Sequence, residues 1–211
     1  MDDQPGLRER KKQRTHEAIS NAAIDLFLEH GFDQVSISQV AEAAEVSRRT
    51  LFAYFPAKED LVLHRVADHE TESARVVRAH PTAPLAALRA HFLDGLARHD
   101  PITGLCDIPE VLALYRLITS TPSLVAGMLR FRANAEHALA AELAGLPGVP
   151  PRTARLAAAQ IAAVQWRLSM DNHDRVATGV PATTAYPGAV AAAEHGFDLL
   201  SHGLAPALRQ P

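Results

Sequence analysis

The sequence predicts an all-α protein with a small N-terminal three-helix unit and a larger helical domain behind it. Apolar residues recur at the three- and four-residue spacing of a helix face, whereas no stretch alternates polar and β-branched residues as a half-buried strand does. Alanine, leucine, arginine and glutamate dominate, all of them good helix formers. Proline and glycine clusters then divide the chain into helical blocks.

Composition narrows the class of protein. The chain has 211 residues, 47% of them hydrophobic and 21% charged, with a net charge of −3. No apolar run reaches the roughly 18 residues that would span a bilayer, and the single cysteine, Cys106, excludes an internal disulfide framework. These features predict a cytosolic protein without an N-terminal signal peptide.

Local signals place the first three helices. Apolar positions predict a helix over about 15–29, which Gly31 ends. The stretch "SISQ" reads as a capping box, with Ser36 as N-cap and Gln39 three residues later. That short helix ends near residue 44, and a second cap, Ser47, begins a helix that Pro56 ends.

The rest of the chain reads as longer helices. One unbroken helix is predicted over 58–79, closed by His80 and Pro81. Five further blocks follow, at about 83–99, 109–119, 123–144, 152–177 and 187–204.

Residues 37–56 fit a helix-turn-helix, in which two helices pack at a steep angle through a small residue at their contact. Ala41 is that small residue, and Glu45 stands at the centre of the turn, where a left-handed backbone favours glycine. The remaining apolar packing positions are Val40, Ala44, Val46, Leu51 and Tyr54. Arg48 and Arg49 then occupy the first turn of the second helix, the end that enters the major groove of DNA in this motif.

The chain resembles the TetR family of transcriptional regulators over residues 15–66. The segments that carry the resemblance are "AAIDLFLEHGF", "SISQVAEAAEVS" and "RRTLFAYFPAKEDL". The resemblance implies a homodimer that binds a palindromic operator, as a repressor, and a variable C-terminal domain that binds a small effector and releases the DNA. It implies DNA-facing positions at Ser36, Ser38, Ser47, Arg48, Arg49, Thr50, Phe52, Ala53, Tyr54 and Lys58.

Several of these positions have a second interpretation. Phe52 fits the core as well as DNA, and Lys58 is expected to hold a phosphate beside the start of the next helix. Residues 1–14 form a basic arm, since "RERKKQR" holds five basic side chains and one acid. That arm is expected either to follow the minor groove or to be a solvated terminus.

The division of the chain follows from these assignments: 1–14 the arm, 15–57 the helix-turn-helix domain, 58–79 a linking helix, and 80–211 the effector-binding and dimerisation domain. An effector is expected to tilt the linking helix and so misplace Arg48 and Arg49. Effector contacts are predicted at Phe92, Leu96, Tyr115, Met128, Phe131, Gln165, Trp166 and Met170, with a core position as the alternative for each. An acyl-coenzyme-A-like molecule is one candidate ligand. Dimer contacts are predicted at Ala159, Ala163, Val190, Ala193, Phe197, Leu200 and Leu204, with an intramolecular core as the alternative.

Other classes of function find less support. Eleven histidines are present, but no HExxH motif, nucleophile elbow or glycine-rich phosphate loop accompanies them. No enzyme, metal site or cofactor is therefore predicted. The alternative that remains is a small-molecule binding module whose helix-turn-helix does not bind DNA. The acidic balance of residues 1–68, with nine Lys/Arg and twelve Asp/Glu, favours this alternative.

Overall fold

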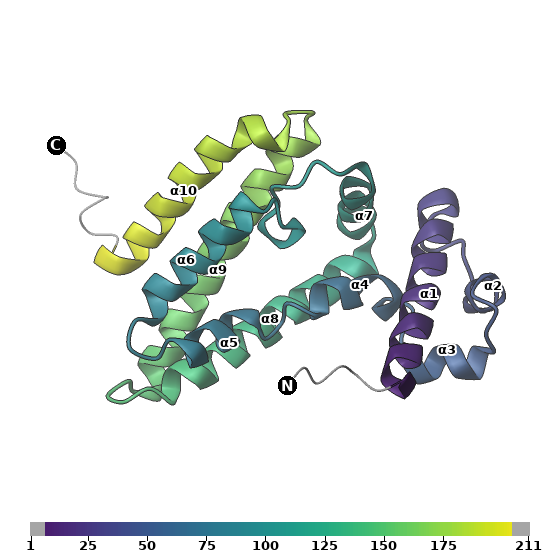
Figure 1. Ribbon diagram of the computed structural model, residues 1–211, viewed down its shortest axis with the longest axis horizontal. Coiled ribbons are helices and arrows are strands. Elements are labelled where there is room, and N and C mark those ends of the chain that lie inside the picture. The colour runs from purple at the N-terminus through teal and green to yellow at the C-terminus, as the bar shows by residue number, and fades with distance from the viewer. Residues whose placement is uncertain (1–6, 204–211) are drawn as a thin grey trace. The chain divides into compact units, whose positions relative to one another are not determined.

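The computed structural model describes residues 7–203. Every regular element in that range is an α-helix or a 3-10 helix, and no strand occurs there (Figure 1). The predicted all-α class is confirmed. The elements are α1 Leu7–His30, α2 Ile37–Ala43, α3 Arg48–Tyr54, α4 Asp60–Ala67, α5 Glu72–Ala79, α6 Pro84–Ala97, η1 Pro101–Thr103, α7 Pro109–Ser120, α8 Pro122–Ala144, α9 Pro151–Ala177 and α10 Ala182–His202.

The chain forms two compact units. The first contains the residues up to Arg65 together with Ala113–Met128, and the second contains Val66–Leu112 together with the residues from Leu129 onward. Each unit therefore draws on separate stretches of sequence.

The first unit packs α1, α2 and α3 around a core of side chains that helical spacing brings to one side of each helix. In α1, Ile19, Ala23 and Phe27 are fully buried. The hydroxyl of Ser20, also buried, donates to the carbonyl of Leu61 over 3.2 Å and so ties α1 to α4. Further buried members are Ile24, Phe32, Val35, Val40, Ala41, Leu51, Phe55, Val62 and Leu63.

Helix α1 begins earlier than the sequence analysis predicted. Residues 7–14, assigned to a basic arm, form its first two turns, because arginine, lysine, glutamine and glutamate favour helix. The Thr15 hydroxyl donates to the Lys11 carbonyl over 3.0 Å within this stretch. The remainder of the predicted arm, residues 1–6, lies outside the described residues.

The predicted unbroken helix over 58–79 is wrong. Helix α4 ends at Ala67 and α5 begins at Glu72, with a turn between them. Backbone bonds tighten there to three-residue spacing: the amides of His69, Glu70 and Glu72 donate to the carbonyls of Val66, Ala67 and His69, each over 3.0 Å. The run of Asp68, His69 and Thr71, all weak helix formers, gives the local reason for the break.

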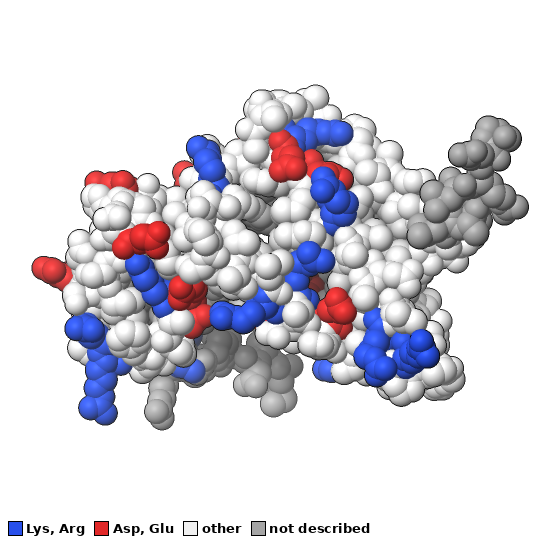
Figure 2. All heavy atoms as spheres, turned by 180° about the vertical axis from the view of Figure 1, so that it is seen from behind, with Lys and Arg blue, Asp and Glu red and all other residues white. Residues whose placement is uncertain are grey.

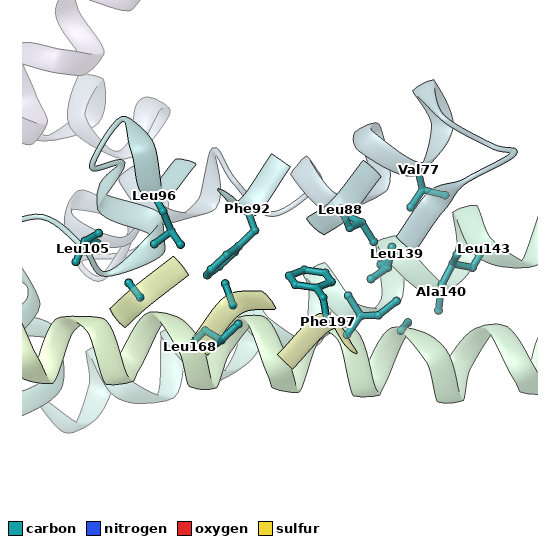
Figure 3. Close-up of a cluster of buried hydrophobic side chains, with 14 of the residues drawn as sticks. Val77, Leu88, Phe92, Leu96, Leu105, Leu139, Ala140, Leu143, Leu168 and Phe197 are labelled. Atoms are coloured by element: carbon teal, nitrogen blue, oxygen red, sulfur yellow. The ribbon is translucent and has the colours of Figure 1, made fainter. Parts of the chain in front are cut away.

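The second unit is built around α9 and α10, which pack along each other, with α6 against α10 and α5 against α6 (Figure 1). Phe92 from α6 and Phe197 from α10 meet in its core with ring centroids 6.2 Å apart (Figure 3). The last helix starts at Ala182, five residues before its predicted start, and includes Pro187. Its first amide is satisfied by the Asp107 carboxylate, 2.8 Å from the Ala182 nitrogen.

A close approach of backbones fixes η1 against α9. Gly104 has a φ of +73°, and a Cβ placed on it would lie 1.9 Å from the Ser169 carbonyl oxygen. The buried amide of Asn172 donates to the Thr103 carbonyl (2.9 Å), and the Ser169 hydroxyl donates to the Ile102 carbonyl (3.0 Å). Glycine is therefore required at position 104, both for its backbone angle and for the space.

The turn between α2 and α3 has the predicted left-handed residue. Glu45 has a φ of +54°, and the amide of Val46 donates to the Ala41 carbonyl over 2.9 Å, which closes the turn over the buried Ala41. An L-residue with a Cβ in this conformation costs roughly 1–2 kcal/mol.

We predict that Glu45→Gly raises the free energy of unfolding by about 1 kcal/mol, because glycine adopts the left-handed conformation without strain. Urea unfolding of the full chain measures this. Glu42→Gly, which removes the same charge within α2, is the control and should lower the free energy of unfolding by about 1 kcal/mol. Equal losses in both variants would contradict the left-handed turn.

Candidate nucleic-acid interface and effector site

Two side-chain caps fix the helices of the helix-turn-helix, as the sequence predicted. At α2, the Gln39 amide donates to the Ser36 Oγ (3.3 Å) and the Ser36 amide donates to the Gln39 Oε1 (2.8 Å). At α3, the Thr50 amide donates to the Ser47 Oγ over 3.0 Å. The hydroxyls of Ser47 and Thr50 also share a hydrogen bond of 2.7 Å, so both side chains hold the helix start in place.

Helix α3 has an inner and an outer face. Leu51 and Phe55, four residues apart, are buried, as predicted. On the outer face Arg48, Arg49 and Ala53 are exposed, and Phe52 keeps 43% of its surface accessible. This exposure excludes the alternative that Phe52 is a core residue. The outer face of α3 thus combines two guanidinium groups with one aromatic ring and a methyl group.

The remaining predicted DNA-facing residues lie around this face. Ser38 is exposed on α2, and Ser36 is exposed at its cap. Tyr54 is half-buried, with its ring centroid 6.3 Å from that of His16 on α1. The same imidazole stacks on Phe55 at 4.3 Å, so α1 supports the C-terminal end of α3.

The Lys58 side chain points toward Phe27 and Phe32 of its own unit. Its ammonium donates to the Phe32 carbonyl over 2.5 Å and lies 4.4 Å from the centre of the Phe32 ring and 5.4 Å from that of Phe27. A cation held by a carbonyl and two aromatic faces stabilises the connection between α1 and α2. This conformation favours a structural role for Lys58 over the predicted role of holding a phosphate.

Basic and acidic side chains are interspersed on the molecular face seen in Figure 2, and no continuous basic area covers it. This agrees with the net charge of −3. Any attraction of α3 for a polyanion must come from local groups such as Arg48 and Arg49.

The eight predicted effector contacts are divided between the two units. Phe92 and Leu96 are buried in the core of the second unit (Figure 3), whereas Tyr115 and Met128 belong to the first unit. Phe131 and Met170 are half-buried. Gln165 accepts a hydrogen bond from the Ser73 hydroxyl (3.4 Å), and the Trp166 ring lies 4.9 Å from the Arg132 guanidinium.

A groove of about 290 Å³ opens elsewhere in the second unit. It lies where the start of α6, the end of α8, the start of α9 and the end of α10 converge, and its two polar residues, Thr153 and Gln160, are uncharged. The lining is Pro84, Leu85, Leu88, Leu143, Leu146, Val149, Thr153, Ala157, Gln160, Ile161 and Leu200. Sequence analysis missed this groove because its walls come from four separate helices.

The predicted dimer seam is in part intramolecular. Ala193 and Phe197 are buried in the core of their own chain, so they are not available to a partner. Val190 and Leu200 pack against the same core and are half-buried. Ala159 is half-buried and Ala163 exposed on α9, where the prediction still applies, and Leu204 lies outside the described residues.

Within residues 7–203 no three His, Cys, Asp or Glu side chains are arranged to hold a metal ion. No single described helix is long and apolar enough to cross a membrane. Helices α7 and α8 meet those criteria only as a pair, bent by 98°.

These features define a helix-turn-helix protein with a second helical unit. Residues 19–64 match the family model described as bacterial regulatory proteins, tetR family. The regulator TcmR of Streptomyces glaucescens is 36% identical over 149 residues, which cover 69% of this chain and 66% of TcmR. The regulator RutR of Escherichia coli is 37% identical over 90 residues, 41% of this chain and 42% of RutR. The chain thus aligns with less than two thirds of either relative.

A solved structure of NalD from Pseudomonas aeruginosa, described as the secondary repressor of the MexAB-OprM multidrug efflux pump, has a similar fold. Its TM-score is 0.55 at 20% identity, over 89% of this chain and 97% of that one. The chain belongs to the tetR family of bacterial regulatory proteins, as the resemblance indicated.

We predict that Lys58→Met lowers the free energy of unfolding by about 1–2 kcal/mol, because a charged hydrogen bond and a cation–π contact are lost. Chemical denaturation of the full chain measures it. Arg48→Met, at an exposed position, should change the value by less than about 0.5 kcal/mol. If Lys58→Met is as stable as the wild type but binds DNA more weakly, the result would contradict the structural role and support a phosphate contact by Lys58.

Proposed function

We propose that this protein regulates transcription by binding double-stranded DNA through the outer face of α3. The observation that carries the proposal is the exposure of Arg48, Arg49 and Phe52 on a helix whose opposite face is buried and whose start is capped. Arginine can donate two hydrogen bonds to guanine or pair with a phosphate, and an apolar side chain can contact the methyl group of thymine.

The proposed complex is a homodimer on an inverted repeat. Two copies of α3 that read two half-sites must lie about one turn of DNA apart, roughly 34–36 Å, or a multiple of that distance. A two-fold dimer meets this requirement through one interface used twice. Exposed or half-buried small residues on α9, Ala159 and Ala163, support an approach of a second copy there. Repression is the proposed mode, with release of the operator when an effector binds.

The groove in the second unit is the proposed effector site. Nine of its eleven lining residues are apolar and none is charged. Its volume of about 290 Å³ is roughly twice that of a 150 Å³ cavity that holds benzene. A compact, uncharged molecule of about two rings with one hydrogen-bonding group therefore fits best, the polar group facing Thr153 or Gln160. An acyl-coenzyme-A-like effector would find no cation in this lining for its phosphates.

For DNA binding we predict that Arg49→Ala weakens affinity for the preferred sequence by about 1–3 kcal/mol, roughly fivefold to 150-fold, because a base or phosphate contact is lost. Selection from random duplexes supplies the sequence, and fluorescence anisotropy at several salt concentrations gives the affinity. Phe52→Ala should relax the preference at one A·T position.

Arg155→Ala is the matched control, since Arg155 is exposed on α9 in the other unit and should not change DNA affinity. Wild-type protein that shows no preference over random DNA, even at low salt, would overturn the proposal. In that case the alternative, a small-molecule binding module that does not bind DNA, would stand.

For the effector site we predict that 1-naphthol binds the wild-type chain and that Ala157→Phe weakens its binding at least about tenfold, because the new ring fills the groove. Isothermal titration calorimetry measures the affinity. Ala90→Phe, at an exposed position of α6 outside the lining, is the control and should bind as the wild type does. Equal affinity in all three chains would place the ligand elsewhere, and decanoyl-coenzyme A, titrated in parallel, tests the acyl alternative.

A further inference from the structure

A carboxylate held between two imidazoles lies at the break between α4 and α5. Glu72 is the first residue of α5. One of its oxygens accepts a hydrogen bond from the His69 Nδ1 over 2.7 Å, and the other accepts from the His91 Nε2 over 2.9 Å. His69 belongs to the turn after α4 and His91 to α6, so one side chain connects three segments. All three side chains are about one quarter to one third exposed.

Helix α5 begins without an ordinary side-chain cap. The residue at the N-cap position of α5, Thr71, makes no side-chain hydrogen bond to the helix start. His69, three residues before Glu72, instead holds the first side chain of the helix. The turn has three-residue backbone bonds at His69, Glu70 and Glu72, and its Thr71 carbonyl accepts the Arg75 amide over 2.9 Å. The imidazole–carboxylate contact is therefore the side-chain interaction that closes the break.

The charges around the turn make that contact sensitive to protons. Asp68, Glu70 and Glu72 fall within five residues and repel one another when ionised. The hydrogen bond to Glu72 raises the pKa of His69 above its ordinary 6.5 against the opposing effect of burial, and the charges of Glu72, Asp100 and Asp68 act in the same direction as the hydrogen bond. The same bond to His69, with His91 adding to it, lowers the pKa of Glu72 below 4.5.

We propose that His69, Glu72 and His91 form a proton-operated clasp that stabilises the break between α4 and α5 and its attachment to α6. Its site matters because the chain leaves the first unit after Arg65, only a few residues earlier. The clasp thus sets how firmly the chain is held as it enters the second unit. This inference is independent of DNA binding and of the effector site.

The direction of the pH dependence follows from the two pKa shifts. A raised pKa of His69 gives stability that is complete below its unfolded value of 6.5 and is lost as pH rises through the folded value. A lowered pKa of Glu72 gives stability that is present above 4.5 and is lost as pH falls through the folded value. The clasp is therefore strongest between about pH 4.5 and 6.5 and weakens as pH rises through the raised pKa of His69.

The test compares the full-length wild type with Glu72→Gln in urea unfolding at about pH 6 and about pH 8.5. At each pH the folded-to-unfolded ratio of the wild type is divided by that of Glu72→Gln. This quotient should be several times larger at about pH 6 than at about pH 8.5. The NMR titration midpoint of His69 should also fall toward 6.5 in the variant. Hydrogen exchange at the amides of His69, Glu70 and Glu72, corrected for intrinsic rate, should be faster in the variant by about threefold or more.

Glu110→Gln is the matched control, because Glu110 also lies in the first turn of a helix but is exposed. Its stability should run parallel to that of the wild type at both pH values. His91→Gln, which keeps the contact between His69 and Glu72, should give an intermediate loss and serves if Glu72→Gln does not fold. An equal gap between wild type and Glu72→Gln at both pH values, or an unchanged His69 midpoint, would overturn the clasp.

Discussion

Burial of Leu51 and Phe55 is the constraint on which the outer face of α3 depends. Helix α3 has seven residues, far below the roughly 12–15 at which an isolated helix becomes even marginally stable in water. It exists because both side chains are 1% exposed or less and because Ser47 caps its start. With the inner face committed to the core, helical spacing directs Arg48, Arg49 and Phe52 outward. The burial of Leu51 and Phe55 therefore also determines which side chains of α3 are exposed.

The support for α3 reaches beyond its own sequence. His16, on α1, stacks on Phe55 and meets His64, on α4, edge to face at 4.8 Å. Lys58 binds the Phe32 carbonyl near the start of the connection between α1 and α2. These contacts join segments that are far apart in the sequence, so several parts of the unit set the position of α3. A rigid support of this kind is what a site needs when its side chains must meet a partner in a defined register.

Sequence alone predicted the parts that local chemistry determines. The caps at Ser36 and Ser47, the left-handed Glu45 and most helix ends follow from residues within a few positions of each feature. The break at residues 68–71 was missed because no proline or glycine marks it. The inward position of Lys58 was missed because its partners, Phe27 and Phe32, are about 26 to 31 residues away.

Long-range packing explains the errors in the second unit. Phe197 and Ala193 lie on one stripe of α10, and a stripe does not reveal whether its partner is α6 of the same chain or a helix of a second copy. The groove in the second unit has the same origin, since Leu88, Leu143 and Ile161 come from three helices. Periodicity identifies which side of a helix is covered, but the partner that covers it is a property of the fold.

The division into units also limits how an effector can act on α3. The chain passes between the units after Arg65, after Leu112 and after Met128. A ligand shifts an equilibrium between two states only by its difference in affinity for them. The groove that we propose for the effector is lined entirely by the second unit, and the chain crossings are covalent routes by which it can influence the first. The first crossing lies within α4, and a few residues later the chain turns between α4 and α5, beside Glu72 and its two histidines. Coupling would therefore depend on how firmly such a junction is held, a property that protons and packing can change without altering the outer face of α3.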